Sequence, residues 1–163
     1  MIFWFHGWNN NIDSALTEYG LSRQFADAGI NAVLVLADTA KDAPDSYGGK
    51  LEQKNTFQGL VKDVLKKLAD MHIISAQAGE GNIILAGHSG AYRVMAHILQ
   101  KGNEPVKEVI LFDALYADTD KFMDWLIADR HHRFINLYTN HGGTFDETKS
   151  MMHQLKDLKI AED

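Results

Sequence analysis

One serine, Ser89, stands where chemistry could take place, in the stretch Gly87-His88-Ser89-Gly90-Ala91. A continuous apolar run precedes this stretch and a segment with helical apolar spacing follows it, which is the context that a nucleophile elbow requires. In such a turn the serine backbone is strained, so the residues two before and two after it must be small, as Gly87 and Ala91 are. The pattern predicts that Ser89 is a nucleophile, and the alternative is a glycine-rich turn with a capping serine.

The helix expected directly after Ser89 would offer backbone N–H groups at its first turn. These groups have no partner within the helix, and they lie where an oxyanion would develop on an acyl group attacked by the serine. The N–H of Gly90 is the first candidate donor. The residue pattern therefore predicts acyl transfer, with one half of an oxyanion hole beside the nucleophile.

Buried apolar runs alternate with amphipathic segments along the chain. This alternation predicts a three-layer α/β sandwich with a mostly parallel sheet of about five strands and helices on both faces, in which a ligand site lies at the carboxyl ends of the strands. Asp13 or Ser14 would cap the first helix and Asp120 the fourth. Length and composition fit one domain over residues 1–163. The expected strands are residues 2–5, 31–38, 82–87, 107–115 and 133–139, and the expected helices are residues 13–29, 57–71, 90–100, 120–130 and 147–158.

Three segments together resemble the α/β-hydrolase superfamily, and the resemblance covers essentially the whole chain. "IFWFHGW" is similar to the strand that ends in His-Gly before the oxyanion loop, "ILAGHSGA" to the nucleophile strand and elbow, and "VILFDALYAD" to the next strand. The resemblance implies that the N–H of Trp8, directly after His6-Gly7, is the second oxyanion donor. It also implies that Asp113 is the acid of a catalytic triad, because an aspartate at the end of that strand has this role in some lipases of the superfamily.

Two other aspartates are candidates for the triad acid. In the superfamily the acid can also follow the next strand, where Asp146 is the nearest carboxylate in "LYTNHGGTFD", and Asp118 in "LYAD" is a third choice. The acid has to lie buried beside an imidazole, orient the ring and stabilise its cation. The choice among Asp113, Asp118 and Asp146 is open at this point.

The general base is the least defined member of the triad. The triad histidine of the superfamily follows a last strand beyond the one expected at 133–139, so the domain is expected to lack that strand and the first strands of the full fold. The base then lies outside these residues or is recruited from elsewhere, and His141 in "TNHGGT" is the only histidine at the exit of a late strand on the ligand edge. Ser89, Asp113 and His141 would keep the superfamily's order of nucleophile, acid and histidine. Five of the other histidines are assigned structural or surface roles: His6, His88, His131, His132 and His153.

These residues predict a serine hydrolase that acts on an ester or amide bond of a small acyl substrate. A second hypothesis, from a different class, is a non-catalytic module that keeps the α/β-hydrolase scaffold without the triad histidine. The loop over residues 39–56 and the segment "ALYADTDKF" would form the pocket walls. The aromatic side chains of Trp8, Tyr92 and Tyr116 point to a partly apolar acyl or aryl group.

Composition argues against several other classes of function. The net charge is −6 and the basic residues form no stripe, so a nucleic-acid partner is not expected. The sequence has no P-loop, dinucleotide or H-E-x-x-H motif and no cysteine, so neither a cofactor nor a metal is expected. No signal peptide or membrane span is visible, which leaves the compartment undefined, with the cytoplasm as the default. A shortened sheet would leave an open edge at which two copies of the chain could pair as a homodimer.

Overall fold

Five short strands form one parallel sheet in the computed structural model, which describes residues 1–160. Each neighbouring pair of strands is parallel, in the spatial order β2-β1-β3-β4-β5. The predicted five strands are confirmed at these positions, and the sheet is parallel throughout the described residues. The strands are β1 (Ile2–Phe5), β2 (Leu34–Ala37), β3 (Ile83–His88), β4 (Val106–Phe112) and β5 (Arg133–Leu137).

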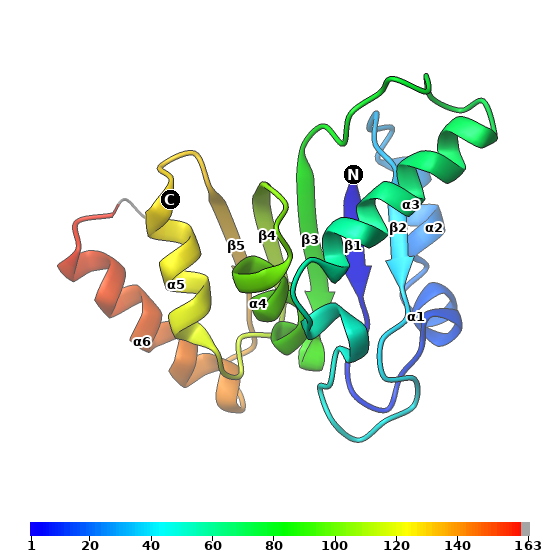
Figure 1. Cartoon of the computed structure of the whole chain (residues 1–163). Coiled ribbons are helices and arrows are strands. Elements are labelled where there is room, and N and C mark those ends of the chain that lie inside the picture. The colour runs from blue at the N-terminus through cyan, green and yellow to red at the C-terminus, as the bar shows by residue number, and fades with distance from the viewer. Residues whose placement is uncertain (161–163) are drawn as a thin grey trace.

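Helices cover both faces of this sheet. Figure 1 shows α3, α4 and α5 in front of the sheet and α1 and α2 behind it. The predicted three-layer α/β sandwich is therefore confirmed. The helices within residues 1–160 are α1 (Ile12–Glu18), α2 (Leu21–Asp27), η1 (Gly49–Glu52), α3 (Thr56–Asp70), η2 (Ser89–Ala91), α4 (Tyr92–Lys101), α5 (Thr119–Ala128) and α6 (Gly143–Asp157), of which η1 and η2 are short 3-10 helices.

The main core fills the space between the sheet and the front helices. Phe3 of β1 is fully buried and meets Phe57 of α3 edge to face, with ring centroids 4.8 Å apart. Leu85 of β3 and Leu111 of β4 continue the same buried layer. Burial of side chains of this size contributes about 1.5–3 kcal/mol each, which fixes the strands whose ends carry the candidate site.

A smaller aromatic cluster packs on the rear of the sheet. The ring of Trp4 in β1 lies 5.4 Å from Phe112 of β4 and 6.5 Å from Tyr19 at the end of α1, measured between centroids. Tyr19 also meets the His88 ring of β3 edge to face. The end of α1 therefore packs against β1 and β3 from behind, and Trp4 extends this cluster to β4.

The strand register brings the candidate residues to one edge of the sheet. His88 of β3 pairs with Phe112 of β4, so Ser89 and Asp113 leave the sheet side by side. On the other side of β3, β1 ends one residue pair earlier. The loops that carry the expected oxyanion donors, nucleophile and acid therefore meet at the carboxyl ends of the strands.

The prediction of one helix over residues 13–29 is wrong. The segment forms two helices, because Gly20 takes a left-handed φ of 57° and separates them. The cap of the first helix is Asn11, whose side chain accepts a hydrogen bond from the Ser14 N–H at 3.0 Å, rather than Asp13 or Ser14. The apolar spacing of the segment does not show this break.

Two later helices begin earlier than predicted. α5 follows Asp118 rather than Asp120, because Asp118 takes a left-handed φ of 58° that turns the chain into the helix. α6 begins at Gly143 rather than near residue 147. Its first turn is fixed by a hydrogen bond from the Thr144 hydroxyl to Asp113, the residue that follows β4, a tertiary contact that helical spacing cannot predict.

The outer strands of the sheet are β2 and β5. The sequence predicts β2 as a strand buried on both faces, but only Ala37 in it is buried, because no strand covers its outer side. β5 has a free outer edge as well, and a groove of about 880 Å³ lies between β5, α5 and α6. Within residues 1–160, no helix combines the length and the apolar character needed to cross a membrane.

Candidate active site

Ser89 has a left-handed backbone conformation at the junction between β3 and α4. Its φ is 53°, the kind of strained conformation that a nucleophile elbow imposes and that costs an L-residue about 1–2 kcal/mol. The short turn η2 begins at Ser89 and continues directly into α4. The strain persists because the paired strand on one side and the helix on the other fix the backbone.

Small residues are required around this turn. A methyl group at Gly87 would lie 2.6 Å from the Ala91 Cβ atom and 2.8 Å from the Met95 sulfur. A methyl group at Gly7, in the loop after β1, would lie 2.9 Å from the Ser89 Cβ atom. The backbone of the His6-Gly7 loop therefore packs directly against the turn that presents Ser89.

Trp8 and Gly90, the two residues expected to donate to an oxyanion, are in contact. A methyl group at Gly90 would collide with the indole ring of Trp8. The indole N–H donates a hydrogen bond to the hydroxyl of Ser46, which comes from the loop after β2. The Trp8 side chain is nevertheless 52% exposed, so it forms part of the molecular surface at the site.

His6 is buried and holds the peptide that precedes Trp8. In the neutral ring, Nδ1 donates to the Gly7 carbonyl oxygen at 2.8 Å and Nε2 accepts from the Thr39 N–H at 3.2 Å, a tautomer inferred from these partners. When the ring is protonated, Nε2 can donate to the Asp38 carboxylate at 3.1 Å. Because the carbonyl oxygen and the following N–H of a trans peptide point in opposite directions, this contact turns the Trp8 N–H away from His6.

Asp113 has a network of hydrogen-bond donors at the end of β4. Its carboxylate accepts from the Thr144 hydroxyl at 2.6 Å and from the Thr139 N–H at 3.1 Å. Burial raises the pKa of Asp113, but the hydrogen bonds outweigh burial, so its pKa lies below the ordinary value. Asp113 is therefore ionised at neutral pH, as the acid of a triad must be.

The other two candidate acids have different surroundings. Asp118 pairs with Lys121 of α5, and Asp146 is exposed in the first turn of α6. Within residues 1–160, no hydrogen bond joins Asp118 or Asp146 to a histidine. Of the three carboxylates, Asp113 alone directly follows β4, the strand that pairs with β3, and β3 ends at His88 immediately before Ser89.

His141 lies in the loop between β5 and α6, close to the group that holds Asp113. Its carbonyl oxygen is 3.0 Å from the Thr139 hydroxyl, which is also 3.2 Å from the Asp113 carboxylate. The His141 side chain is exposed. Across the part of the chain that the structure describes, no histidine ring hydrogen-bonds the Ser89 hydroxyl or the Asp113 carboxylate.

His88 belongs to the rear cluster. Its Nδ1 atom is 3.3 Å from the Tyr19 hydroxyl, and the two ring centroids are 5.4 Å apart. Burial lowers the pKa of His88 below its ordinary value, against the nearby Asp113 carboxylate, which raises it. His88 is therefore neutral at pH 7 and is fixed by aromatic packing.

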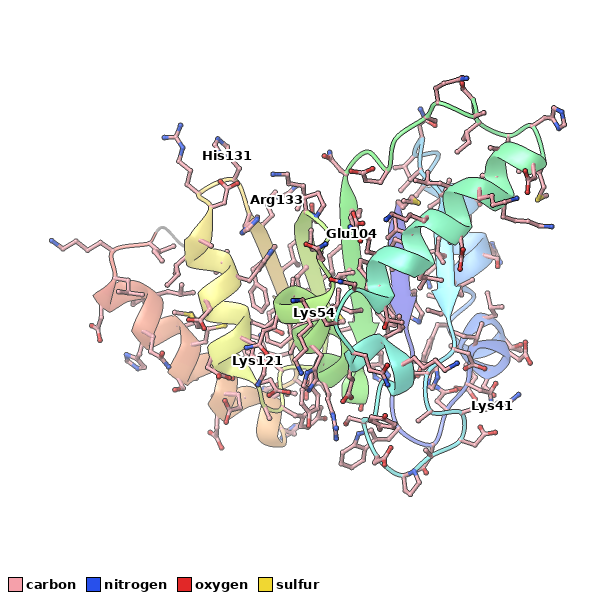
Figure 2. The ribbon with its side chains drawn as sticks, in the orientation of Figure 1. Lys41, Lys54, Glu104, Lys121, His131 and Arg133 are labelled. Carbon is pink, nitrogen blue, oxygen red and sulfur yellow. The ribbon has the colours of Figure 1, made fainter. Side chains whose placement is uncertain are left out.

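The remaining predicted residues lie on the rim of the site or far from it. Tyr92 begins α4 and packs against Tyr116, with ring centroids 6.2 Å apart. Figure 2 shows His131 and Arg133 at the opposite end of the sheet from the strand arrowheads. In residues 1–160, no group of three or more His, Cys, Asp or Glu side chains could hold a metal ion.

Sequence reasoning missed the hydroxyl residues that hold the site together. Ser46 binds the Trp8 indole, and Thr139 and Thr144 bind Asp113. Single Ser and Thr residues in polar loops follow no spacing pattern, so no motif marks them. The one signal is that Thr139 and Thr144 are the first and last residues of the "TNHGGT" stretch around His141.

Known proteins resemble this chain in backbone arrangement. No protein-family model and no curated protein matches it. FphF of Staphylococcus aureus, a fluorophosphonate-binding serine hydrolase solved with substrate bound, superposes with a TM-score of 0.60 at 11% identity, over 98% of this chain and 72% of that chain. A protein of Xanthomonas campestris pv. campestris, described as a hydrolase of the α/β superfamily, gives a TM-score of 0.37 at 14% identity, over 96% and 98% of the two chains.

The strand order, the helices on both faces and the match to FphF define the class of fold. The chain has an α/β-hydrolase-like fold. At 11% identity the match establishes the fold alone, so the roles of Ser89, Asp113 and His141 have to be argued from this chain's own geometry.

Proposed function

We propose that this protein is a serine hydrolase that cleaves an ester or amide bond of a small acyl substrate, with Ser89 as the nucleophile. The observation that carries the proposal is the left-handed φ of 53° at Ser89, at a strand-to-helix junction against which the Gly7 backbone packs. A serine that merely caps a helix takes an extended backbone and needs no strain. The strained turn instead supports a role that requires an exposed hydroxyl beside helix N–H groups.

In the proposed reaction, the Ser89 oxygen attacks the acyl carbon and its proton passes to a histidine nitrogen. The carbonyl oxygen becomes an oxyanion, which accepts hydrogen bonds from the backbone N–H groups of Gly90 and Trp8. The histidinium then protonates the leaving alcohol or amine, and the acyl group stays on Ser89. Water attacks this acyl-enzyme with the same histidine as base, which releases the acid and restores the serine.

We assign the acid to Asp113 and the base to His141. Asp113 is ionised, and an adjacent carboxylate favours the imidazolium that forms during attack. The His141 backbone lies beside Thr139, the residue that also binds Asp113. For His141 to act, its exposed ring has to turn inward towards the ends of β3 and β4.

A second candidate function is a non-catalytic module with a hydrolase-like fold. The observation that favours it is the absence, within residues 1–160, of a histidine ring bonded to the Ser89 hydroxyl. Such a protein would present the same turn and the same N–H groups but would not activate the serine.

A small fluorophosphonate probe separates the two functions. We expect the wild-type protein to be labelled at Ser89, as read by peptide mass spectrometry, and Ser89→Ala to lose the label. Ser75→Ala, in the exposed loop before β3, should be labelled like the wild type. His141→Ala should slow labelling by about 10²–10⁴-fold, because a positioned base contributes that much. A folded wild-type protein that takes no label between pH 6 and 9 would favour the non-catalytic function.

A further inference from the structure

The segment over residues 39–52, which ends in η1 and is called the bridging loop below, contacts the loop that carries Trp8. The hydroxyl of Ser46 accepts the hydrogen bond from the Trp8 indole. Backbone hydrogen bonds extend this contact along both loops, so the two loops have a fixed position relative to each other. The backbone pairs are Asn9 N–H to Ala43 O at 2.8 Å and Asp42 N–H to Asn10 O at 2.9 Å.

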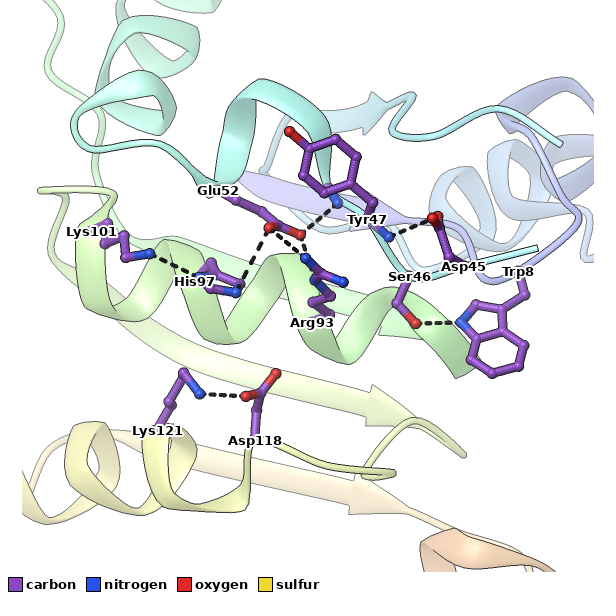
Figure 3. Close-up of polar contacts among 11 residues, drawn as sticks. Trp8, Asp45, Ser46, Tyr47, Glu52, Arg93, His97, Lys101, Asp118 and Lys121 are labelled. Carbon is purple, nitrogen blue, oxygen red and sulfur yellow. Dashed lines mark hydrogen bonds and ion pairs between the residues drawn. The ribbon is translucent and has the colours of Figure 1, made fainter. Parts of the chain in front are cut away.

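The other end of the bridging loop is clamped to α4, the helix that begins at the elbow. Glu52 accepts from the Nε atom of Arg93 at 2.8 Å and from its Nη2 atom at 3.0 Å, a bidentate pair (Figure 3). Glu52 also accepts from the Gly48 N–H at 2.8 Å. Its side chain is only 10% exposed, so the geometry is held more firmly than in a surface ion pair.

The bridging loop packs closely on the first turns of α4 and on the elbow. A methyl group at Gly48 would lie 2.5 Å from a Val94 methyl carbon, so the loop backbone touches the helix. Between the loop and the elbow there is a cavity of about 10 Å³, lined by Ser46 on one side and Gly7 and Gly90 on the other. This space is about the size of one water molecule.

We propose that Glu52 and Arg93 are positioning residues that set the spacing of the two oxyanion donors. The pair fixes the bridging loop on α4. The hydrogen bond between Ser46 and the Trp8 indole then fixes Trp8 relative to that loop. The N–H of Trp8 is thereby held at a defined distance from the N–H of Gly90, which belongs to η2, the short turn that continues directly into α4. This inference rests on the proposed hydrolase function, and neither Glu52 nor Arg93 touches the reacting atoms.

The chemistry explains why such a pair would matter. Oxyanion donors act only when they lie within about 2.7–3.1 Å of the position that the oxyanion takes. The two donors come from different loops, joined through the sheet and through the bridging loop. A displacement of about 1 Å by a change far from the chemistry can cost about 100-fold in rate. A loosened bridging loop would therefore reduce the stabilisation of the transition state more than that of the ground state.

The first test measures hydrolysis of p-nitrophenyl acetate. Glu52→Gln should lower kcat by about 10–100-fold with little change in KM, because the lost interaction acts in the transition state. Arg93→Lys keeps the charge without the bidentate fork and should give an intermediate kcat. The matched control is Glu108→Gln, a carboxylate 16% exposed and 3.3 Å from Arg133 at the far end of the sheet. An unchanged kcat in Glu52→Gln, or an equal loss in the control, would overturn the inference.

The second test asks whether the pair acts through Ser46. Ser46→Ala should lower kcat in the wild-type background. It should change kcat little in Glu52→Gln, because in that variant the bridging loop no longer holds Ser46 against Trp8. Fully additive losses would show that Glu52 affects the rate by another path and would overturn the inference.

A spectroscopic test keeps the inference separate from the proposed function. Acrylamide quenching of the Trp8 emission, obtained as the difference between each protein and its Trp8→Phe version, should increase in Glu52→Gln. Circular dichroism and thermal unfolding should show that the variant is folded. If Trp8 quenching is the same in Glu52→Gln as in the wild type, the positioning inference is overturned, whether or not the protein is active. An inactive and unlabelled wild type would overturn the proposed function, whatever the quenching shows.

Discussion

The left-handed backbone at Ser89 lowers the stability of the protein, while the serine hydroxyl is required for the proposed activity. Glycine takes a φ near 53° without strain, whereas alanine retains the strain and lacks only the hydroxyl. We expect Ser89→Gly to be more stable than Ser89→Ala by about 1 kcal/mol, measured by urea unfolding. Neither variant should take the fluorophosphonate label. Equal stability of the two variants would contradict the left-handed backbone at this position.

The hydrogen bonds to Asp113 make part of the stability depend on pH. Because the pKa of Asp113 is lowered in the folded protein, its contribution is present above the unfolded pKa of about 3.9 and is lost as the pH falls through the folded pKa. Thr144→Val removes the 2.6 Å hydrogen bond, so we expect it to cost about 1.5 kcal/mol at pH 7 and less near pH 3. Urea unfolding at both pH values measures the difference.

Thr148 provides the control for this prediction. It is another buried threonine of α6, and its hydroxyl donates to the Thr144 carbonyl oxygen and accepts from Asn136. No carboxylate takes part, so the cost of Thr148→Val should be the same at both pH values. A pH-independent cost for Thr144→Val as well would show that Asp113 is not the acceptor that matters.

At the scale of elements, the break between α1 and α2 depends on one glycine. Gly20 has a φ of 57° with open space where a side chain would lie, so Gly20→Ala should cost about 1 kcal/mol through backbone strain alone. Gly59, in the interior of α3, also faces open space but has a helical backbone, so Gly59→Ala should stabilise by about 0.5–1 kcal/mol. Chemical unfolding of both variants should give opposite signs, and equal signs would contradict this account.

The helices of this protein show what local sequence can and cannot predict. The apolar spacing from Phe57 onwards predicts α3 correctly, because Phe57 and Val61 are buried in the core and Leu60, Val64 and Leu65 pack against it from the same helix. The break at Gly20 and the early start of α6 depend on a backbone angle and on a tertiary hydrogen bond, which periodicity does not encode. For the site, the elbow is readable because its chemistry imposes small residues at fixed spacing, whereas Ser46 and Glu52 act through contacts between loops that are distant in sequence.

At the scale of the whole molecule, we propose that two copies of the chain pair through the free edge of β5. The outer edge of a strand presents unpaired N–H and C=O groups that can pair with another chain, and Leu137 on this strand is 54% exposed. The wild type should sediment as a dimer at high concentration, and Leu137→Lys should shift it to the monomer without loss of secondary structure. Met71→Lys, equally exposed at the end of α3, should keep the wild-type behaviour. A monomeric wild type at all concentrations would rule out the pairing.

The position of β1 in the sheet has a consequence for synthesis of the protein. β1 lies between β2 and β3, although both of these strands follow it in the chain. While the ribosome makes the chain, β1 can pair with β2 early, but its other edge stays unpaired until β3, which ends at His88, has emerged. Such non-local parallel pairing is slow and exposes hydrophobic strands in the meantime. In nascent chains that end before His88, the edge of β1 that later pairs with β3 is free. Phe3 and Phe5 on this strand are buried only in the folded protein, so β1 is the segment on which a chaperone would act.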